Sequence, residues 1–448
     1  MFRDLSEKIH FVGIGGASMS ALALFLAENG HVITGSDNND TTNLFKNQVN
    51  IKTFVGHNAE NVGDAGTLVY TRAVGEQNPE VVRARDKGIR VMERAELLGI
   101  VGDAFAKGVA VAGTHGKTTT TSLISTLLIM MKKDPTVMVG GKMQLCDSNF
   151  VSGKSDLFVY EACEYHDAFL HFHPFAAVIL NIELDHPDYF KSYEQLEDSF
   201  AAYAANVRDG GFTVVNGADA GVKKLLKDGK IKSPVTFGIG EGFDVFAADV
   251  SIEDGSSSYT LCFKDGRRFP VRLGVGGRHN LLDSLAAFAV IDGLGFDVAE
   301  AVKYAADFVS PKRRYELVFK RDNLTVIDDF AHHPTELAAT LSMARAGKYD
   351  TVIIIFQPHT YTRTAALLDD FAKSLSLADH AILLPIYAAR EKDIYNVSSD
   401  DLAAMVKGAE SARSFEEAGK MAMRRVKGKT VILTVGAGDV YKVWEWLK

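Results

Sequence analysis

Short apolar runs alternate with longer amphipathic segments in three successive stretches of the chain. The first stretch opens with an apolar run at 9–12, turns through glycines, continues as an apolar helix at 19–28 and returns as a strand at 31–34. A strand, a glycine turn, a helix and a second strand make a βαβ unit, which implies a parallel sheet. The pattern fades after residue 102, and we expect a first domain over 1–105.

The second stretch has the pattern of a buried parallel sheet that ends in hairpins. Its predicted elements are strands at 109–112, 157–160 and 176–180 and a closing helix at 280–293. Between 244 and 273 the alternation is stricter, and Asp-Gly pairs stand at 254–255 and 265–266. Such pairs between alternating runs predict antiparallel hairpins, here at the far edge of the sheet. We expect a central domain over 106–310.

The third stretch repeats the alternation of strands and helices. Its predicted strands are 324–327, 351–356, 381–384 and 431–434. This predicts a second doubly wound domain over 311–448. The expected fold is therefore α/β in three domains: a Rossmann-like N-terminal domain, a central P-loop ATPase-type domain with a parallel sheet, and a Rossmann-like C-terminal domain.

Composition narrows the class of protein without naming an activity. The chain has 448 residues, which is too long for one core, and its 47% hydrophobic and 24% charged residues are ordinary for a globular protein. A net charge of -8 argues against nucleic-acid binding. The apolar run 123–131 is too short to cross a membrane, and no apolar leader is present, so we expect a cytoplasmic protein without a membrane partner. Its isolated thiols, expected to be reduced, are Cys146, Cys163 and Cys262.

The strongest chemical signal is a glycine-rich loop between a buried strand and a helix. It reads Gly113-Thr114-His115-Gly116-Lys117-Thr118, followed by Thr119. Backbone N–H groups of such a loop bind phosphate, the lysine neutralises β- and γ-phosphate oxygens, and the Thr118 hydroxyl can bind magnesium. Val111 stands where the strict P-loop pattern has glycine, so this is a shortened variant. The alternative, a chance Gly-Lys-Thr turn, does not explain the strand-to-helix setting.

Acidic residues and a histidine follow two of the predicted strands. Glu161 comes directly after 157–160, while Asn181, Asp185 and His186 come after 176–180. The carboxyl ends of parallel strands meet at one edge of a sheet, which places these side chains near the phosphate loop. Magnesium prefers hard oxygen ligands, so Glu161 is a candidate ligand. Its alternative is a solvated surface charge, and His186 is either structural or a second metal ligand.

Basic residues and histidines gather after the strands of the third domain. They are Lys312, Arg313, Arg314, His332, His333, His359, Arg363 and Arg390, with the acids Asp328 and Asp329. Separate loops that offer such groups at one sheet edge suit a site for carboxylates and phosphates, although each segment alone could be ordinary surface charge. The N-terminal glycine turn is a weaker signal for a nucleotide diphosphate, with Ser18 where a dinucleotide fingerprint has glycine or alanine.

Taken in order, these motifs resemble those of the Mur ligases over essentially the whole chain. The matching segments are 10–16 with Met19-Ser20, 113–120, 161–165, Asn181 with Asp185-His186, 277–280, Arg313-Arg314, Asp328-Asp329 with 332–334, and 356–359. The pattern is most similar to that of the member that adds L-alanine to UDP-N-acetylmuramate. The resemblance implies an ATP- and Mg²⁺-dependent ligase of peptidoglycan precursor synthesis that makes its amide bond through an acyl phosphate.

The resemblance also implies roles for individual residues. The first domain would hold the UDP-linked substrate, through Gly15, Gly16, Ala17, Ser18, Met19, Ser20 and Asp37. ATP would be bound by residues 113–119 together with Asn280 and Asp329, and the metal by Thr118, Glu161 and His186. The groups implied in catalysis are Lys117, His186, Arg313 and Arg314. The muramyl and alanine end would face His332, His359 and Arg363.

Three departures from the family pattern concern the periphery of this chemistry. Relatives often have glycine at 17 or 18, tyrosine where Phe330 stands and arginine where Thr360 stands.

Two other interpretations are a sister ligase that acts on another amino acid or murein peptide, and a nicotinamide-dependent oxidoreductase built on the first βαβ unit. The oxidoreductase hypothesis leaves Lys117 and Glu161 unexplained. We expect a monomer or a weak homodimer.

Overall fold

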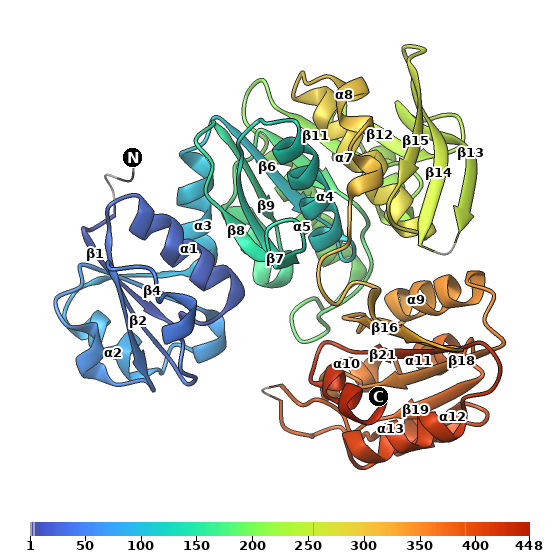
Figure 1. Cartoon of the computed structure of the whole chain (residues 1–448). Helices are drawn as coiled ribbons and strands as arrows, with labels where there is room; N and C mark the ends of the chain where they lie inside the picture. Colours follow the sequence, from blue (N-terminus) through green and yellow to red (C-terminus); the bar gives the residue numbers. More distant parts are fainter. Residues whose placement is uncertain (1, 3–4, 254, 390) are drawn as a thin grey trace.

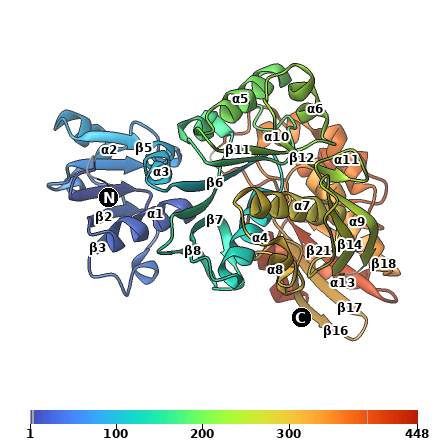
Figure 2. The same cartoon turned by 90° about the horizontal axis from the view of Figure 1, so that it is seen from above.

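The computed structural model describes residue 2 and residues 5–253, 255–389 and 391–448, so that Asp254 of the predicted hairpin and Arg390 of the basic group lie outside the described residues. Three separate sheets define three α/β domains, and the central domain lies between the other two (Figures 1 and 2). Among the described residues, no helix combines the length and the apolar character needed to span a membrane.

The N-terminal domain is a five-stranded parallel sheet in the order β3-β2-β1-β4-β5. Its elements are β1 (Lys8–Val12), α1 (Ala17–Glu28), β2 (Val32–Asp37), β3 (Ile51–Val55), β4 (Thr67–Tyr70), α2 (Pro79–Asp86), β5 (Arg90–Glu93) and α3 (Arg94–Asp103), with short 3-10 turns η1 (Thr42–Leu44), η2 (Ala59–Val62) and η3 (Arg72–Val74). The order reverses between β1 and β4, where ligands bind in such sheets. The predicted βαβ unit is confirmed, and its glycine turn lies at this reversal.

The central domain is built on a ten-stranded sheet in the order β15-β14-β13-β12-β11-β10-β6-β9-β7-β8. Its strands are β6 (Lys107–Ala112), β7 (Thr136–Met143), β8 (Ser148–Val151), β9 (Leu157–Glu161), β10 (Ala176–Ile179), β11 (Phe212–Asn216), β12 (Val235–Ile239), β13 (Val245–Glu253), β14 (Ser256–Phe263) and β15 (Arg268–Leu273). Its helices are α4 (Lys117–Met130), α5 (Tyr193–Ala205), α6 (Ala220–Lys227), α7 (Arg278–Gly293) and α8 (Val298–Val302), with η4 (Tyr165–His171) and η5 (Ala305–Asp307). The predicted antiparallel hairpins are β13 to β15 at one edge.

Alternate residues of the central strands enter different cores. Val109 and Val111 of β6 pack with the apolar faces of α4 and α7. Ala110 and Ala112 lie in the core that contains α5 and α6, and this core continues into the N-terminal domain. Stacked rings such as Phe105 and Phe158, whose centroids are 5.0 Å apart, lie at that junction. The N-terminal and central domains therefore share a packed core.

The C-terminal domain is a six-stranded sheet in the order β16-β17-β21-β18-β19-β20, parallel except for β16. Its elements are β16 (Glu316–Arg321), β17 (Leu324–Asp329), α9 (Pro334–Ala346), β18 (Thr351–Phe356), α10 (Tyr361–Ala366), α11 (Leu368–Leu375), β19 (His380–Leu383), α12 (Ser399–Met405), β20 (Glu410–Ser411), α13 (Phe415–Arg424), β21 (Thr430–Val435) and η6 (Val440–Trp446). The apolar faces of α9 and α11 cover one side, and those of α13 and η6 cover the other. The loop before α9 faces the central domain (Figure 1).

Candidate active site

The predicted phosphate loop connects β6 to α4, and its two glycines are required by geometry. Gly113 and Gly116 have φ angles of +140° and +86°, a region that side chains disfavour. A Cβ on Gly113 would lie 2.9 Å from the Cβ of Leu180, and one on Gly116 would lie 2.8 Å from Oδ1 of Asp283. No side chain caps the start of α4. The first N–H groups of this helix are therefore available to an anion.

Asn181 ties the loop to the end of the neighbouring strand β10. Its Oδ1 accepts from the backbone N–H of His115 at 2.8 Å, and its Nδ2 donates to the His115 carbonyl at 3.1 Å. The Thr114 hydroxyl donates to the backbone carbonyl of Glu183 at 2.9 Å. These bonds hold the loop in one shape, which prepares it for phosphate.

The side-chain ammonium group of Lys117 folds back into the phosphate loop. Its Nζ donates to the carbonyls of Gly113 and Thr114 and lies 2.9 Å from Oε2 of Glu164, a side chain only 2% exposed. Burial lowers the pKa of Lys117, but the Glu164 carboxylate outweighs burial and raises it. The sequence analysis assigned no role to Glu164, the second acid of the matching segment 161–165.

Two predicted metal ligands border the same segment of β7. Oε1 of Glu161 accepts from the backbone N–H of Gly140 at 2.6 Å, and the Cγ2 of Thr118 lies 3.3 Å from where a Cβ of Gly141 would be. A threonine hydroxyl and a carboxylate are hard oxygen donors of the kind that magnesium prefers, so the chemistry of these two residues suits such an ion.

His186, the third predicted ligand, is half-buried beside Tyr165 and Asp185. Its ring stacks on Tyr165 with centroids 4.3 Å apart, and its Nε2 lies 3.8 Å from Oδ2 of Asp185. Burial lowers the pKa of His186, which favours the neutral imidazole that metals bind. Glu164 and Lys117 are among the charges that act on its pKa, so His186 belongs to the same region as the loop.

A cavity of about 290 Å³ opens between the central and C-terminal domains. The residues predicted for ATP that line it are His115, Gly116, Thr119, Asn280 and Asp329. The cavity is also lined by His279, which lies in the matching segment 277–280 but was given no role, and by three residues that the sequence did not indicate, Asp283, Thr335 and Glu336. The cavity residues of the central domain and those of the C-terminal domain are far apart in the sequence. They meet only because the C-terminal domain lies over the phosphate loop, so no local sequence signal could have identified them together.

Burial alters the acids and the histidine of this cavity. It raises the pKa of Asp283 to about 7 and that of Asp329 to about 6, and it lowers the pKa of His279 to about 4. Asp329 accepts from the Thr340 hydroxyl at 2.8 Å and from the N–H of Ala331 at 3.1 Å. Its carboxyl group therefore shapes the turn after β17 as well as lining the cavity.

The structure separates the two neighbouring arginines predicted for catalysis. Nη2 of Arg314 lies 3.5 Å from the hydroxyl of Thr118, and the Arg314 side chain lines the cavity. Arg313 instead donates to Oδ2 of Asp328 at 2.8 Å and to the carbonyls of Gly436 and Gly438. Arg314 thus reaches the phosphate loop, while Arg313 stabilises the C-terminal domain.

Phe330 contacts both arginines. Its ring centroid lies 5.1 Å from the Arg313 guanidinium and 5.3 Å from that of Arg314. A phenyl face provides this contact as well as a phenol would. Phenylalanine in place of the family's tyrosine therefore preserves the ring contact with both arginines.

Arg363 connects the C-terminal domain to the central domain. Its Nε and Nη2 donate to the two carboxylate oxygens of Asp185 at 2.9 and 3.1 Å, and both side chains are more than nine-tenths buried. The arginine outweighs burial and holds the pKa of Asp185 well below its usual range. The guanidinium predicted to face substrate is thus engaged in an interdomain ion pair.

His332 and His359 lie beside this ion pair. Their rings are 5.8 Å apart, and burial lowers the pKa of His332 to about 4 and that of His359 to about 3. The histidines are uncharged at neutral pH and offer lone pairs. Thr360, where relatives often have arginine, has a φ of +67° and caps α10 by accepting from the N–H of Arg363 at 3.4 Å.

The N-terminal glycine turn presents backbone rather than side chains. The N–H of Gly15 donates to Oδ2 of Asp37 at 3.0 Å, so Asp37 shapes the turn. Gly16, Ala17 and Ser18 are accessible at the start of α1. Arg94, which sequence reasoning missed, donates to the Ser18 hydroxyl at 3.2 Å and brings a positive charge to this turn.

Two residues of the predicted substrate turn face inward. Met19 is 2% exposed and packs in the N-terminal core, and Ser20 is 8% exposed, with its hydroxyl bonded to the carbonyl of Ala17. Their side chains support the helix, because α1 must bury its inner face against the sheet.

Comparison with known proteins places this geometry in a family. Three domain models match in succession: "Mur ligase family, catalytic domain" over 8–106, "Mur ligase middle domain" over 111–291 and "Mur ligase, glutamate ligase domain" over 313–438. A UDP-N-acetylmuramate–L-alanine ligase of Clostridium botulinum is 39% identical, with 99% of this chain and 98% of that protein covered. The corresponding protein of Caldanaerobacter subterraneus is 42% identical, with 98% and 96% covered.

Two solved structures match this fold over nearly the whole chain. The crystal structure of a UDP-N-acetylmuramate-alanine ligase from Thermotoga maritima matches with a TM-score of 0.81 at 31% identity, over 98% of both chains. A murein peptide ligase from Psychrobacter arcticus, at 23% identity, has the same fold with a TM-score of 0.74 over 98% of both chains. The phosphate loop, the strand-end acids and the closing third domain thus occur in a chain that belongs to the Mur ligase family.

Proposed function

We propose that this protein joins L-alanine to the carboxylate of UDP-N-acetylmuramate with ATP, releasing ADP and phosphate, as a step in peptidoglycan precursor synthesis. The names of relatives about 40% identical over nearly the whole chain support this substrate pair. The observation that carries the reaction type is the phosphate loop of one domain covered by Arg314 of another. ATP in the cavity between these domains would have its phosphates at the start of α4.

The first step is transfer of the γ-phosphoryl group. A carboxylate oxygen of the muramyl group attacks the γ-phosphorus, the bond to the β–γ bridging oxygen breaks, and ADP leaves. Lys117 and Arg314 face the phosphate oxygens and stabilise the negative charge that spreads over them. Because Glu164 keeps Lys117 charged and in place, this stabilisation is present before the reaction begins.

The second step is attack by the amine on the acyl phosphate. The neutral amino group of L-alanine attacks the carbonyl carbon, the amide bond forms, and phosphate leaves with the proton that the amine loses. His332 and His359 are uncharged, and the Nδ1 of His332 lies 3.0 Å from the carbonyl of Phe330. We infer that their free ring nitrogens accept hydrogen bonds from the amino group and orient it.

Magnesium is the metal that this donor set would hold. We assign Thr118 and Glu161 to one ion and His186 to the support of a second. Such an ion would neutralise β- and γ-phosphate charge.

At the other end of the substrate, the N–H groups at Gly16, Ala17 and Ser18, with Arg94 beside them, suit the UDP diphosphate. ATP and UDP-sugars are cytoplasmic metabolites, so we propose that the enzyme is cytoplasmic. We also propose that it works as a monomer or weak homodimer.

The test is phosphate release from ATP with UDP-N-acetylmuramate and each amino acid in turn. Release that depends on L-alanine is the expected result. Release only with another amino acid, or only with a UDP-muramyl peptide, would keep the mechanism and replace the substrate. If no combination releases phosphate, the ligase proposal fails.

A further inference from the structure

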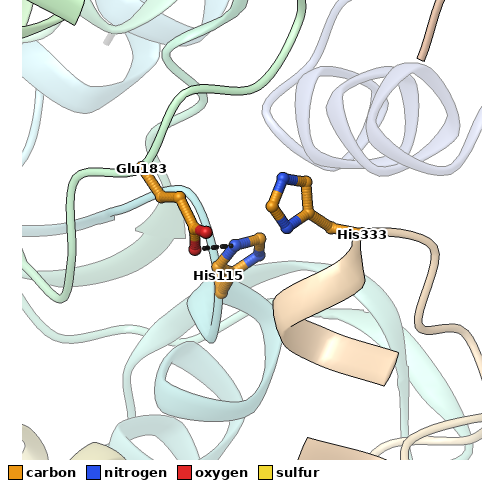
Figure 3. Close-up of side chains that lie close together, drawn as sticks. All are labelled: His115, Glu183 and His333. Carbon is orange, nitrogen blue, oxygen red and sulfur yellow. Dashed lines mark hydrogen bonds and ion pairs between the residues drawn. The ribbon is translucent and has the colours of Figure 1, made fainter. Parts of the chain in front are cut away.

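Two histidines and a glutamate converge where the central and C-terminal domains meet. His115 comes from the phosphate loop, Glu183 from the segment after β10 and His333 from the start of α9 (Figure 3). One donor atom from each lies within 4.8 Å of the others, and Nε2 of His115 is 3.0 Å from Oε2 of Glu183. Two imidazoles with one carboxylate make a donor set typical of zinc sites.

Each of the first two groups has a supporting partner behind it. The other ring nitrogen of His115, Nδ1, lies 3.3 Å from Oε1 of Glu336. The other oxygen of Glu183, Oε1, accepts from the Thr335 hydroxyl at 2.6 Å. Metal-binding histidines and carboxylates commonly have such second partners, which fix the tautomer and the orientation of the ligand.

The third group is a buried imidazole that forms the N-cap of α9. His333 is 3% exposed, and its ring centroid lies 4.7 Å from that of His115. Its Nδ1 caps α9 by accepting from the N–H of Thr335 at a long 3.3 Å, and its Nε2 has no hydrogen-bond partner among the described residues. Asparagine, aspartate or serine would cap a helix better, so capping alone does not account for a buried imidazole.

We propose that His115, Glu183 and His333 bind a divalent transition-metal ion of the zinc class, which links the C-terminal domain to the central domain. Donor atoms around tetrahedral zinc lie about 3.4 Å apart for bonds of about 2.1 Å, so small side-chain rotations from the present spacing close the site. Binding through Nε2 of His115 releases the proton on that nitrogen to solvent, while the Nδ1 proton stays on the side of Glu336. In His333 the Nδ1 lone pair turns from the Thr335 N–H to the ion, the proton stays on Nε2, and a water molecule completes the coordination. Magnesium does not compete, because imidazole favours zinc, cobalt and nickel.

The direct test is titration of the protein with Co²⁺ alone, in buffer with excess Mg²⁺ and without ATP or UDP-substrate. We expect one equivalent to give visible absorption bands of a nitrogen- and oxygen-bound ion, which Zn²⁺ then removes. His333→Asn keeps a good helix cap but loses the ligand, and it should weaken binding at least about tenfold. Glu183→Gln should do the same.

The matched control is His173→Asn, because His173 is an exposed histidine beside Asp103 at 3.2 Å. Its Co²⁺ affinity should equal that of the wild type. Equal affinity in wild type, His333→Asn and Glu183→Gln would show an adventitious ion only and overturn the site. Since no substrate is present, this result is independent of the ligase activity.

The link between domains is tested separately. With Zn²⁺ bound, release of a fluorescent ATP analogue should slow several-fold in the wild type and stay unchanged in His333→Asn. Equal release rates with and without Zn²⁺ in the wild type would leave the ion bound but overturn its role in holding the domains together.

Discussion

At the scale of single residues, the site depends on charges that are compensated before any phosphate arrives. Lys117 is buried, and a lone buried ammonium would be strongly destabilised. Glu164, 2.9 Å away and itself 2% exposed, offsets that penalty. The pair therefore keeps a permanent positive charge in the loop, where transferred phosphoryl groups require it.

Lys117→Ala should lower turnover by at least about a hundredfold while the affinity for the UDP-substrate stays nearly unchanged. The reason is that the lysine faces the phosphoryl group, whereas the UDP-substrate turn lies in another domain. Steady-state kinetics and calorimetric titration with UDP-N-acetylmuramate measure the two quantities.

Two companion variants exclude a simple folding defect. The alanine change leaves Glu164 buried without its partner, so Lys117→Ala with Glu164→Gln removes the stray charge and should remain as slow. The exposed Lys303 gives the control, and Lys303→Ala should have wild-type turnover. Wild-type turnover in Lys117→Ala would contradict the assignment of the phosphate loop.

At the scale of elements, a buried carboxylate joins three parts of the N-terminal domain. Glu80 of α2 is fully buried and accepts from the Ser36 hydroxyl at the end of β2, from the Asn61 amide at 2.6 Å and from the N–H of Asn58 at 3.1 Å. Asp37, which shapes the glycine turn, is the next residue after Ser36. The network thus holds β2 and the following loop in register with the substrate turn.

This network predicts a pH dependence of stability. Burial raises the pKa of Glu80, but the His10 ring 3.5 Å away and the hydrogen bonds from Ser36 and Asn61 outweigh burial and lower the pKa to about 2. A lowered pKa stabilises the folded state above the unfolded pKa of about 4.5, and the contribution is lost as the pH falls towards 2. It amounts to on the order of 3 kcal/mol near neutral pH.

Glu80→Gln should therefore unfold more easily than the wild type at pH 7, and the difference in free energy of unfolding should shrink below pH 4.5. Urea unfolding at a series of pH values measures it. Glu76→Gln, at an exposed acid of the same domain, is the control and should show little difference. A Glu80→Gln difference that is constant from pH 7 to pH 3 would contradict the lowered pKa.

At the scale of the whole molecule, the C-terminal domain is closed against the central domain. The contacts that cross the boundary include those of Arg363 with Asp185, Glu336 with His115, and Thr335 with Glu183. The first is a buried bidentate ion pair, and removing one partner of such a pair costs about 3–5 kcal/mol. This closed arrangement brings Arg314 to the phosphate loop, so residues of both domains form the site.

Arg363→Ala should shift the protein towards an open arrangement, because it leaves the buried Asp185 carboxylate without the arginine that holds it across the boundary. Small-angle X-ray scattering should then give a larger radius of gyration than for the wild type, and ATP analogue with UDP-substrate should reduce the difference. Arg345→Ala is the matched control: Arg345 also makes a bidentate pair, with Asp379, but within the C-terminal domain. Equal radii for Arg363→Ala and wild type would show that this pair does not hold the domains together.

Much of the fold could be predicted from the sequence, because buried parallel strands have a local signature. The apolar runs at 109–112, 351–356 and 431–434 correspond to β6, β18 and β21. The edge strands β5 and β20 were missed, since Arg90–Glu93 and Glu410–Ser411 are short and carry charged residues rather than apolar alternation. Edge strands need only one covered face, so their sequences resemble loops.

The sequence by itself determined the phosphate loop and the family, because glycines at positive φ followed by Lys117 and Thr118 are a local requirement of phosphate binding. Only the tertiary structure decided which neighbour acts: that Glu164 pairs with Lys117 and that Arg314, not Arg313, reaches Thr118. Adjacent residues have the same sequence signal but point in different directions. Which direction meets the site depends on strand register and on the docking of a second domain, and neither is written in the spacing of residues.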